Sequence, residues 1–323
     1  MASVLSLTDV SKTYGSFQAV KNLSFEVERG AICGFLGPNG AGKTSTIRMI
    51  LGLQGATSGR IEILGADDGR KVRDRIGFLP EERGLYKKMT PVEAISYLGS
   101  LKGLPASEGR VRARDMLEQM GLGHAQKKKM KDLSKGMAQK VQLIASVVHQ
   151  PEFVILDEPF SGLDPMNQQG LEAMIRSLAS NGATVLFSTH VMQHAERLCD
   201  KVVLMARGQK AFEGTVDEAR ATSPRYLEIE GALDVAAISA LPGVTDVEVL
   251  SREGDVLNLK AGLSPQVQAQ EPLRTAFMSN LDVRRFQLRE PSLHDAFIAL
   301  TGDNPDVDQR HKAVDGELAE VAQ

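Results

Sequence analysis

The chain has 323 residues, of which 42 % are hydrophobic and 24 % charged, so it can form about one to three domains with sizeable cores. The formal net charge of −3 excludes the globally basic surface typical of nucleic-acid-binding proteins, and we expect no nucleic-acid partner. No run approaches the roughly 18 consecutive apolar residues of a membrane span. The first residues lack a secretory signal pattern, so we expect another chain to do any spanning of a membrane.

Apolar runs in the first part of the chain predict short strands, and a glycine-rich turn followed by a helix interrupts them. The two cysteines, Cys33 and Cys199, lie in apolar segments far apart, where buried free thiols and a reducing compartment are expected and a disulfide is the alternative. The strands are expected over residues 4–8, 23–27, 31–36, 61–64 and 76–79, and the helix over 43–53.

From about residue 89 to 149 the pattern becomes helical. Thr90, Pro91 and Glu93 are typical of a capping box with proline at the first helical position. Strands alternate with helices again after this block, and such alternation predicts an α/β domain with a largely parallel sheet. The helical block, residues 83–149, is expected as an insertion in that domain. The later elements are expected over residues 153–156, 166–180, 184–188 and 202–205.

A second unit begins near Pro224, where the predicted elements follow the order βαββαβ. This order matches the ferredoxin-like arrangement. We therefore expect a first domain over 1–220, a small α+β domain over 221–301 and a disordered acidic tail over 302–323. Within the second unit, strands are expected over 226–230, 244–250, 256–260 and 283–288, and helices over 235–240 and 265–279.

Residues 37–44 read GPNGAGKT and fit the phosphate-binding pattern G-x-x-x-x-G-K-[ST]. Glycines allow backbone N–H groups to approach phosphate oxygens, and the following helix adds its positive N-terminal end. Lys43 can reach the β- and γ-phosphates, and the Thr44 hydroxyl can ligate Mg²⁺. A chance match is the alternative, but the apolar strand before it and the helix after it favour nucleotide binding. The predicted nucleotide-binding residues here are Gly37, Pro38, Asn39, Gly40, Ala41, Gly42, Lys43, Thr44 and Ser45.

Two acids, Asp157 and Glu158, end the continuously apolar segment that begins at Phe153. Ligands of open α/β sheets bind at the carboxyl ends of strands. Asp157 is therefore predicted to orient Mg²⁺, and Glu158 to polarise the water that attacks the γ-phosphate. Two solvated acids at a strand end are the alternative.

Together with these motifs, further segments resemble one family, the ABC ATPases. LSKGM at residues 133–137 resembles the family's signature motif, FSGLD at 160–164 its D-loop, and His190 its switch histidine. Tyr14 resembles the aromatic residue that stacks on adenine. Taken singly, LSKGM would indicate a helix start with a serine cap, His190 a structural histidine, and Tyr14 a turn residue or a core aromatic. The order of the motifs over residues 4–215 is specific to the family.

The resemblance implies a P-loop NTPase of the ABC ATPase type with an inserted helical subdomain. It implies that ATP, with Mg²⁺, is sandwiched between two copies of the chain. Ser134 and Gly136 would then act on the nucleotide of the other copy, with the D-loop residue Asp164 beside them. His190 would join Glu158 as a catalytic residue.

Three positions depart from the family pattern. Lys135 replaces a signature glycine and Met137 the signature glutamine, whereas Ser134 and Gly136 are retained. Glu81 stands where the family has its Q-loop glutamine. Glutamate can still ligate Mg²⁺, so Glu81 is predicted as a metal ligand, although it adds a negative charge beside the phosphates.

The stretches LPEERGLYKKMT and PSLHDAFIALTG resemble ATPase subunits of prokaryotic ABC-2 type exporters, with the sodium-export ATPases as the nearest group. This resemblance implies a peripheral protein on the cytoplasmic face of the cell membrane with polytopic permease subunits as partners. Residues 81–89 would contact the permease, or else form an exposed charged loop. The basic run at 127–131 is interpreted as a solvated face rather than a lipid or nucleic-acid site.

Three other functions remain open for the sequence. A soluble ABC ATPase could act on DNA or ribosomes, although the chain has neither the long coiled coil nor the second cassette of the known types. The C-terminal unit could be a ligand-sensing or dimerising module. A P-loop nucleotide kinase would make the signature and D-loop segments coincidences.

Overall fold

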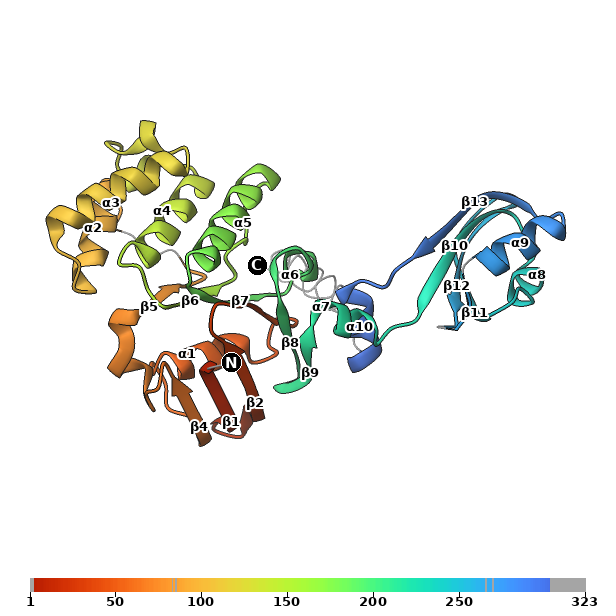
Figure 1. Cartoon of the computed structure of the whole chain (residues 1–323), viewed down its shortest axis with the longest axis horizontal. Helices are drawn as coiled ribbons and strands as arrows, with labels where there is room; N and C mark the ends of the chain where they lie inside the picture. The colour runs from red at the N-terminus through yellow and green to blue at the C-terminus, as the bar shows by residue number, and fades with distance from the viewer. Residues whose placement is uncertain (1–2, 83, 85, 265, 269, 303–323) are drawn as a thin grey trace, which may run out of the picture. The chain divides into compact units, whose positions relative to one another are not determined.

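The computed structural model describes residues 3–82, 84, 86–264, 266–268 and 270–302. The described chain divides into two compact units, which meet in sequence between Val216 and Asp217 (Figure 1). From residue 303 onward, the tail predicted to be disordered lies outside the described residues.

The first unit is built on a six-stranded sheet in the order β5-β6-β7-β3-β8-β9. All neighbouring strands are parallel except β8 and β9, which confirms the prediction of a largely parallel sheet. The central strands β3, β6 and β7 are buried along their whole length, as expected for strands covered on both faces. The six strands are β3 (Ile32–Leu36), β5 (Ile76–Leu79), β6 (Phe153–Asp157), β7 (Thr184–Thr189), β8 (Lys201–Ala206) and β9 (Gln209–Thr215).

Helices α1 (Lys43–Ile50), α5 (Pro165–Ser180) and α6 (Met192–Leu198) connect these strands. Helix α1 ends three residues before the predicted end, because Gly52 turns the chain with a positive φ of 68°. Both cysteines are free thiols, as predicted: Cys33 is buried and Cys199 partly buried.

A second sheet in this unit is antiparallel, in the order β2-β1-β4. Its strands are β1 (Ser3–Tyr14), β2 (Phe17–Glu28) and β4 (Ser58–Ile63). The first two are much longer than predicted, because their outer halves pair in a hairpin whose residues alternate without a continuous apolar run. This hairpin brings Tyr14 opposite Phe17 beside its turn.

The helical insertion lies between β5 and β6, which pair directly with each other. It contains α2 (Pro91–Leu101), α3 (Ala106–Gln119) and α4 (Lys135–Val147) around a small apolar core of their own, which includes Ile95, Leu117 and Val141. The predicted capping box is present: Thr90 Oγ1 accepts from Glu93 N at 3.3 Å, and Glu93 Oε2 accepts from Thr90 N at 2.7 Å.

His149 follows α4 and contacts β5, the strand that precedes the helical insertion. Its Nε2 lies 3.2 Å from the carbonyl oxygen of Ile76 in β5, whereas its buried Nδ1 has no hydrogen-bond partner. Burial, with a smaller contribution from Lys102, lowers the pKa of His149 to about 4.

We expect the free energy of unfolding to decrease as the pH falls from about 6.5 towards 4. The unfolded histidine, with an ordinary pKa near 6.5, takes up a proton in this range that the folded one does not. Urea denaturation at several pH values should show a shallower decrease for His149→Gln. The exposed His124→Gln is the matched control, and equal slopes for wild type and His149→Gln would contradict the prediction.

The second unit contains a four-stranded antiparallel sheet in the order β11-β12-β10-β13. The chain order confirms the predicted βαββαβ succession, and the core includes Leu227, Ile229, Ile238 and Leu259. Helix α9 begins later than predicted, at Gln270. The elements are β10 (Arg225–Ala232), α8 (Val235–Ser239), β11 (Val244–Glu253), β12 (Val256–Leu263), α9 (Gln270–Met278) and β13 (Asp282–Arg289).

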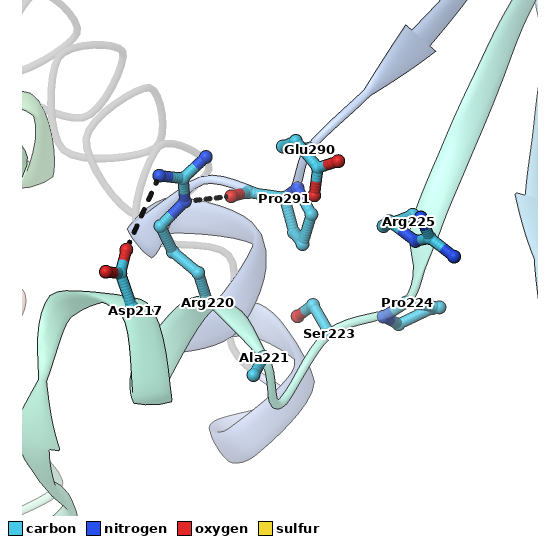
Figure 2. A pocket seen from close by; sticks show the side chains of 8 residues that line it. All are labelled: Asp217, Arg220, Ala221, Ser223, Pro224, Arg225, Glu290 and Pro291. Atoms are coloured by element: carbon cyan, nitrogen blue, oxygen red, sulfur yellow. Dashed lines mark hydrogen bonds and ion pairs between the residues drawn. The ribbon is translucent and has the colours of Figure 1, made fainter. Parts of the chain in front are cut away.

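Helix α7 (Val216–Arg220) precedes the strands of this sheet in the chain, and helix α10 (Leu293–Thr301) follows them. Arg220 Nε donates to the carbonyl oxygen of Pro291 at 2.6 Å and so joins the two linking segments (Figure 2). The adjoining cavity of about 380 Å³ has two arginines and two acids in its wall, a balance unlike that of a phosphate site. Its lining residues are Asp217, Arg220, Ala221, Ser223, Pro224, Arg225, Glu290 and Pro291.

Candidate nucleotide site

The loop between β3 and α1 requires glycine at two positions. Gly37 and Gly42 have φ values of 153° and 98°, which other residues rarely adopt. A Cβ atom would lie 2.2 Å from the carbonyl oxygen of Met205 at Gly37, and 2.6 Å from that of Ala19 at Gly42. The backbone can therefore wrap closely only because these positions lack side chains.

Lys43, the first residue of α1, points back into this loop. Its side chain is only 6 % exposed, and its Nζ donates to the carbonyl oxygens of Gly37 at 2.6 Å and Pro38 at 3.2 Å. Burial lowers the pKa of Lys43, against the attraction of nearby carboxylates. An ammonium held by carbonyl oxygens of the loop can move onto phosphate oxygens.

The two predicted acids occupy different environments at the end of β6. Asp157 is almost fully buried, and its Oδ1 accepts from Ser188 Oγ at 2.5 Å. Burial raises the pKa of Asp157, and hydrogen bonds with Ser188 and Thr44 oppose that rise. Both partners are hydroxyls beside the loop, so the Asp157 carboxylate is within reach of a cation held by Thr44.

Glu158 has a left-handed backbone, with φ 47°, which is uncommon for a residue other than glycine. Its N–H donates to both Ser188 Oγ and the Ser188 carbonyl oxygen, each at 3.2 Å. The turn aims the Glu158 carboxylate back at the loop, where Oε1 lies 3.8 Å from Lys43 Nζ. Such local strain is typical of functional positions.

His190 follows β7, the strand beside β6. Its Nδ1 lies 3.0 Å from Glu158 Oε1, and the pKa of His190 is raised, mainly by its hydrogen bond with Glu158. Glu81 follows β5, on the other side of β6, and lines the same cleft. The structure therefore brings Lys43, Glu158, His190 and Glu81 together at one edge of the sheet.

The cleft itself has a volume of about 210 Å³. Four predicted residues do not line the cleft, namely Gly37, Pro38, Ala41 and Asp157. The lining residues are Phe17, Ala19, Asn39, Gly40, Gly42, Lys43, Thr44, Ser45, Glu81 and Glu158.

Phe17 and Ala19 were not predicted, and they reach the cleft from β2. Phe17 is 64 % exposed there, a signal that a sequence pattern alone does not carry. Tyr14 does not line the cleft. Its hydroxyl hydrogen-bonds with Gln54 and lies 3.5 Å from Ser45 Oγ, so it borders the site beside the loop.

The signature residues lie away from the cleft. Ser134 is the N-cap of α4 and accepts from Met137 N at 3.3 Å, while Gly136 lies in the first turn, close to Asn167. The D-loop residue Asp164 caps α5 and accepts from Asn167 N at 3.0 Å, and this hydrogen bond lowers its pKa. Ser134 and Gly136 therefore do not meet the phosphate loop of their own chain.

Lys135 and Glu81 border a second cavity, of about 410 Å³. Its other lining residues are Glu82, Gln139 and Ser161, so it connects the segment after β5 with the signature helix and the D-loop. This cavity places two of the three departures from the family pattern, Lys135 and Glu81, on one surface.

Oxygen donors for a Mg²⁺ ion are present beside the loop, namely the Thr44 hydroxyl and the carboxylates of Asp157 and Glu81. Among the described residues, no cluster of three or more His, Cys, Asp or Glu could hold a metal ion by itself. Mg²⁺ usually takes one or two protein ligands and completes its shell with phosphates and water.

Two protein-family models match the chain. The first describes the ABC transporter and covers residues 20–161, and the second describes the C-terminal domain of DrrA1-3-like ATP-binding proteins and covers residues 214–301. In the described part of the chain, no helix has the length and apolar character that crossing a membrane requires.

Similar proteins match over nearly their whole length. The chain is 37 % identical over 300 residues to the uncharacterized ABC transporter ATP-binding protein YhaQ of Bacillus subtilis (strain 168), covering 93 % of this chain and 99 % of that protein. It is 33 % identical over 308 residues to the bacitracin transport ATP-binding protein BcrA of Bacillus licheniformis, covering 94 % and 98 %. A solved ATP-binding subunit of an ABC transporter, 32 % identical, superposes with a TM-score of 0.63 over 68 % of this chain and 92 % of its own.

Proposed function

Since this chain belongs to the ABC transporter family as an ATP-binding subunit, we propose that it drives a membrane exporter. The chain is an ATPase that binds ATP. In the proposal, two copies close on Mg-ATP, and closure and hydrolysis drive export through separate transmembrane subunits on the cytoplasmic face of the cell membrane. The bacitracin transport relative and the DrrA-like C-terminal domain support the assignment to export.

The observation that carries the catalytic part of the proposal is the contact of Glu158 with both Lys43 and His190. Loop residues 37–45 hold the phosphates, with Lys43 on the β- and γ-phosphates. Glu158 orients the attacking water, and His190, whose ring contacts the same carboxylate, holds it beside the γ-phosphate. Thr44, Asp157 and Glu81 would hold Mg²⁺, which would supply positive charge to balance the charge that develops on the phosphates.

The second copy is proposed because Ser134 and Gly136 are missing from the cleft of their own chain. They stand at the start of α4, whose N-terminal N–H groups can bind phosphate oxygens. A facing chain would complete the site by placing this helix end, with Asp164 nearby, over the γ-phosphate.

The role of Glu81 can be tested through the Mg²⁺ dependence of ATP hydrolysis. We expect Glu81→Ala to need several-fold more Mg²⁺ for half-maximal turnover, because it removes an oxygen ligand at the cleft wall. Glu82→Ala, the neighbouring exposed glutamate, is the control for net charge. Coincident Mg²⁺ curves for wild type and Glu81→Ala would reject the metal-ligand role.

The aromatic platform for adenine can be tested with two variants. Stacking on a base contributes roughly 1–3 kcal/mol, so we expect Phe17→Ala to weaken ATP binding about tenfold or more and to leave tripolyphosphate binding unchanged. Tyr14→Ala, measured beside it by calorimetry, tests the role implied by the family resemblance. A variant with wild-type ATP affinity is not part of the platform.

The exporter assignment is tested by purifying the tagged chain from detergent-solubilised native membranes and identifying bound proteins by mass spectrometry. A stoichiometric polytopic partner is expected. Ribosomal proteins or DNA-processing factors without a membrane chain would instead support the ATPase acting on soluble machinery.

A further inference from the structure

The segment that follows Glu158 is anchored by a buried aromatic stack. Phe160 is 4 % exposed, and its ring lies on that of His194, with centroids 4.2 Å apart and planes 21° apart. The rings of Phe160 and Phe187 also pack edge to face, with centroids 5.9 Å apart. Offset-stacked and edge-to-face arrangements of this kind are the favourable geometries for aromatic pairs.

The His194 ring also contacts two polar side chains, those of the buried Glu172 and the half-exposed Arg197. Its Nδ1 accepts from Arg197 Nη2 at 3.1 Å, and the same guanidinium nitrogen lies 2.9 Å from Glu172 Oε1. His194 and Glu172 are each 5 % exposed. Burial lowers the pKa of His194, and the contact of its Nδ1 with Glu172 Oε1, at 3.5 Å, opposes that shift.

The position of the Glu158 carboxylate depends on the backbone around it. Ser188 holds the Glu158 N–H, the Glu158 carbonyl oxygen accepts from Ser161 N at 3.1 Å, and Gln139 donates to the carbonyl oxygen of Pro159 at 3.2 Å. Phe160 is the first aromatic residue after the left-handed residue, two positions along the chain, and it is buried. The packing of the Phe160 ring therefore restrains the direction in which the chain leaves Glu158.

His190 and His194 contact the two ends of the turn from Glu158 to Phe160. His190 contacts the Glu158 carboxylate at 3.0 Å, and four residues later His194, in α6, stacks on Phe160. We propose that His194 is a positioning residue for ATP hydrolysis. By packing against the Phe160 ring, it keeps the Glu158 carboxylate directed at the attacking water. The inference rests on the proposed role of Glu158.

The test compares three substitutions of His194 in the full-length chain. His194→Leu fills the space without an aromatic ring, His194→Ala empties it, and His194→Phe restores the ring and leaves the Glu172–Arg197 ion pair in place. We expect His194→Leu and His194→Ala to lower kcat on the order of 10- to 100-fold, because a misplacement of about 1 Å has such an effect. KM for ATP should stay within about twofold, since the phosphate loop is unchanged, and His194→Phe should recover most of kcat.

Assays are run well below the thermal unfolding midpoint of each variant, with the exposed His124→Ala as the matched control. Normal kcat in folded His194→Leu would overturn the proposal. Equal losses in His194→Leu and His194→Phe would also overturn it, because the ring would then not be the active feature. A parallel rise in KM would show a general structural role and count against it too.

Glu158→Gln, assayed alongside, separates this inference from its premise. If Glu158→Gln retains turnover, the role of Glu158 fails and the inference fails with it. If Glu158→Gln is inactive and the His194 variants are normal, only the inference fails.

Discussion

We expect Glu158→Gln to lower steady-state ATP turnover at least about a hundredfold, the contribution of a positioned general base. The amide has nearly the size and shape of the carboxylate, so it fits the same left-handed turn, but it cannot accept a proton from water. Because ATP still binds the unchanged loop, the variant is expected to accumulate as an ATP-bound dimer. Phosphate release measures the first effect, and size-exclusion chromatography with light scattering measures the second.

The His190 ring supplies an independent readout of the same substitution. Its pKa is raised chiefly by the hydrogen bond with Glu158, so removing the negative charge should lower it. Titration of the ring by NMR would show this shift in the nucleotide-free protein. Near-normal hydrolysis by Glu158→Gln would reject its catalytic assignment, and Glu62→Gln, an exposed glutamate in β4, is the matched control.

We expect Lys43→Ala to lose most of its affinity for ATP. The substitution removes the one side-chain cation that lies inside the phosphate loop in the described structure, 3.8 Å from Glu158. It also leaves the buried Glu158 carboxylate without this partner, which would repel the triphosphate. Both effects oppose binding, so the loss should exceed that of any single loop residue that acts through its backbone.

Isothermal titration calorimetry with ATP measures this loss, and circular dichroism confirms that the variant is folded. Lys128→Ala, an exposed lysine in the helical insertion, controls for the change in net charge. ATP binding by Lys43→Ala with wild-type affinity would refute the assignment of the phosphate loop.

The sequence predicted best what depends on neighbouring residues. The loop glycines, Lys43 and the Asp157–Glu158 pair follow one another along the chain, and the strands before them are continuously apolar. The capping box at Thr90 is likewise local. Edge strand β9 was missed because QKAFEGT is only half-buried and has no regular alternation.

What the sequence could not predict depends on contacts between distant segments. Phe17 reaches the cleft only because the hairpin of β1 and β2 extends past the predicted strands. Phe160 packs on a histidine 34 positions later in the sequence, and no sequence pattern links the two residues. Packing of this kind leaves no periodic signal in one sequence.

The bond between Arg220 and Pro291 has a consequence for how this architecture can change over generations. A domain whose first and last residues lie close together can be gained, exchanged or lost in a single genetic event without a change in the chain path of the neighbouring domain. A protein engineer can use the same property, replacing residues 225–289 by a short turn between the segments that Arg220 already joins.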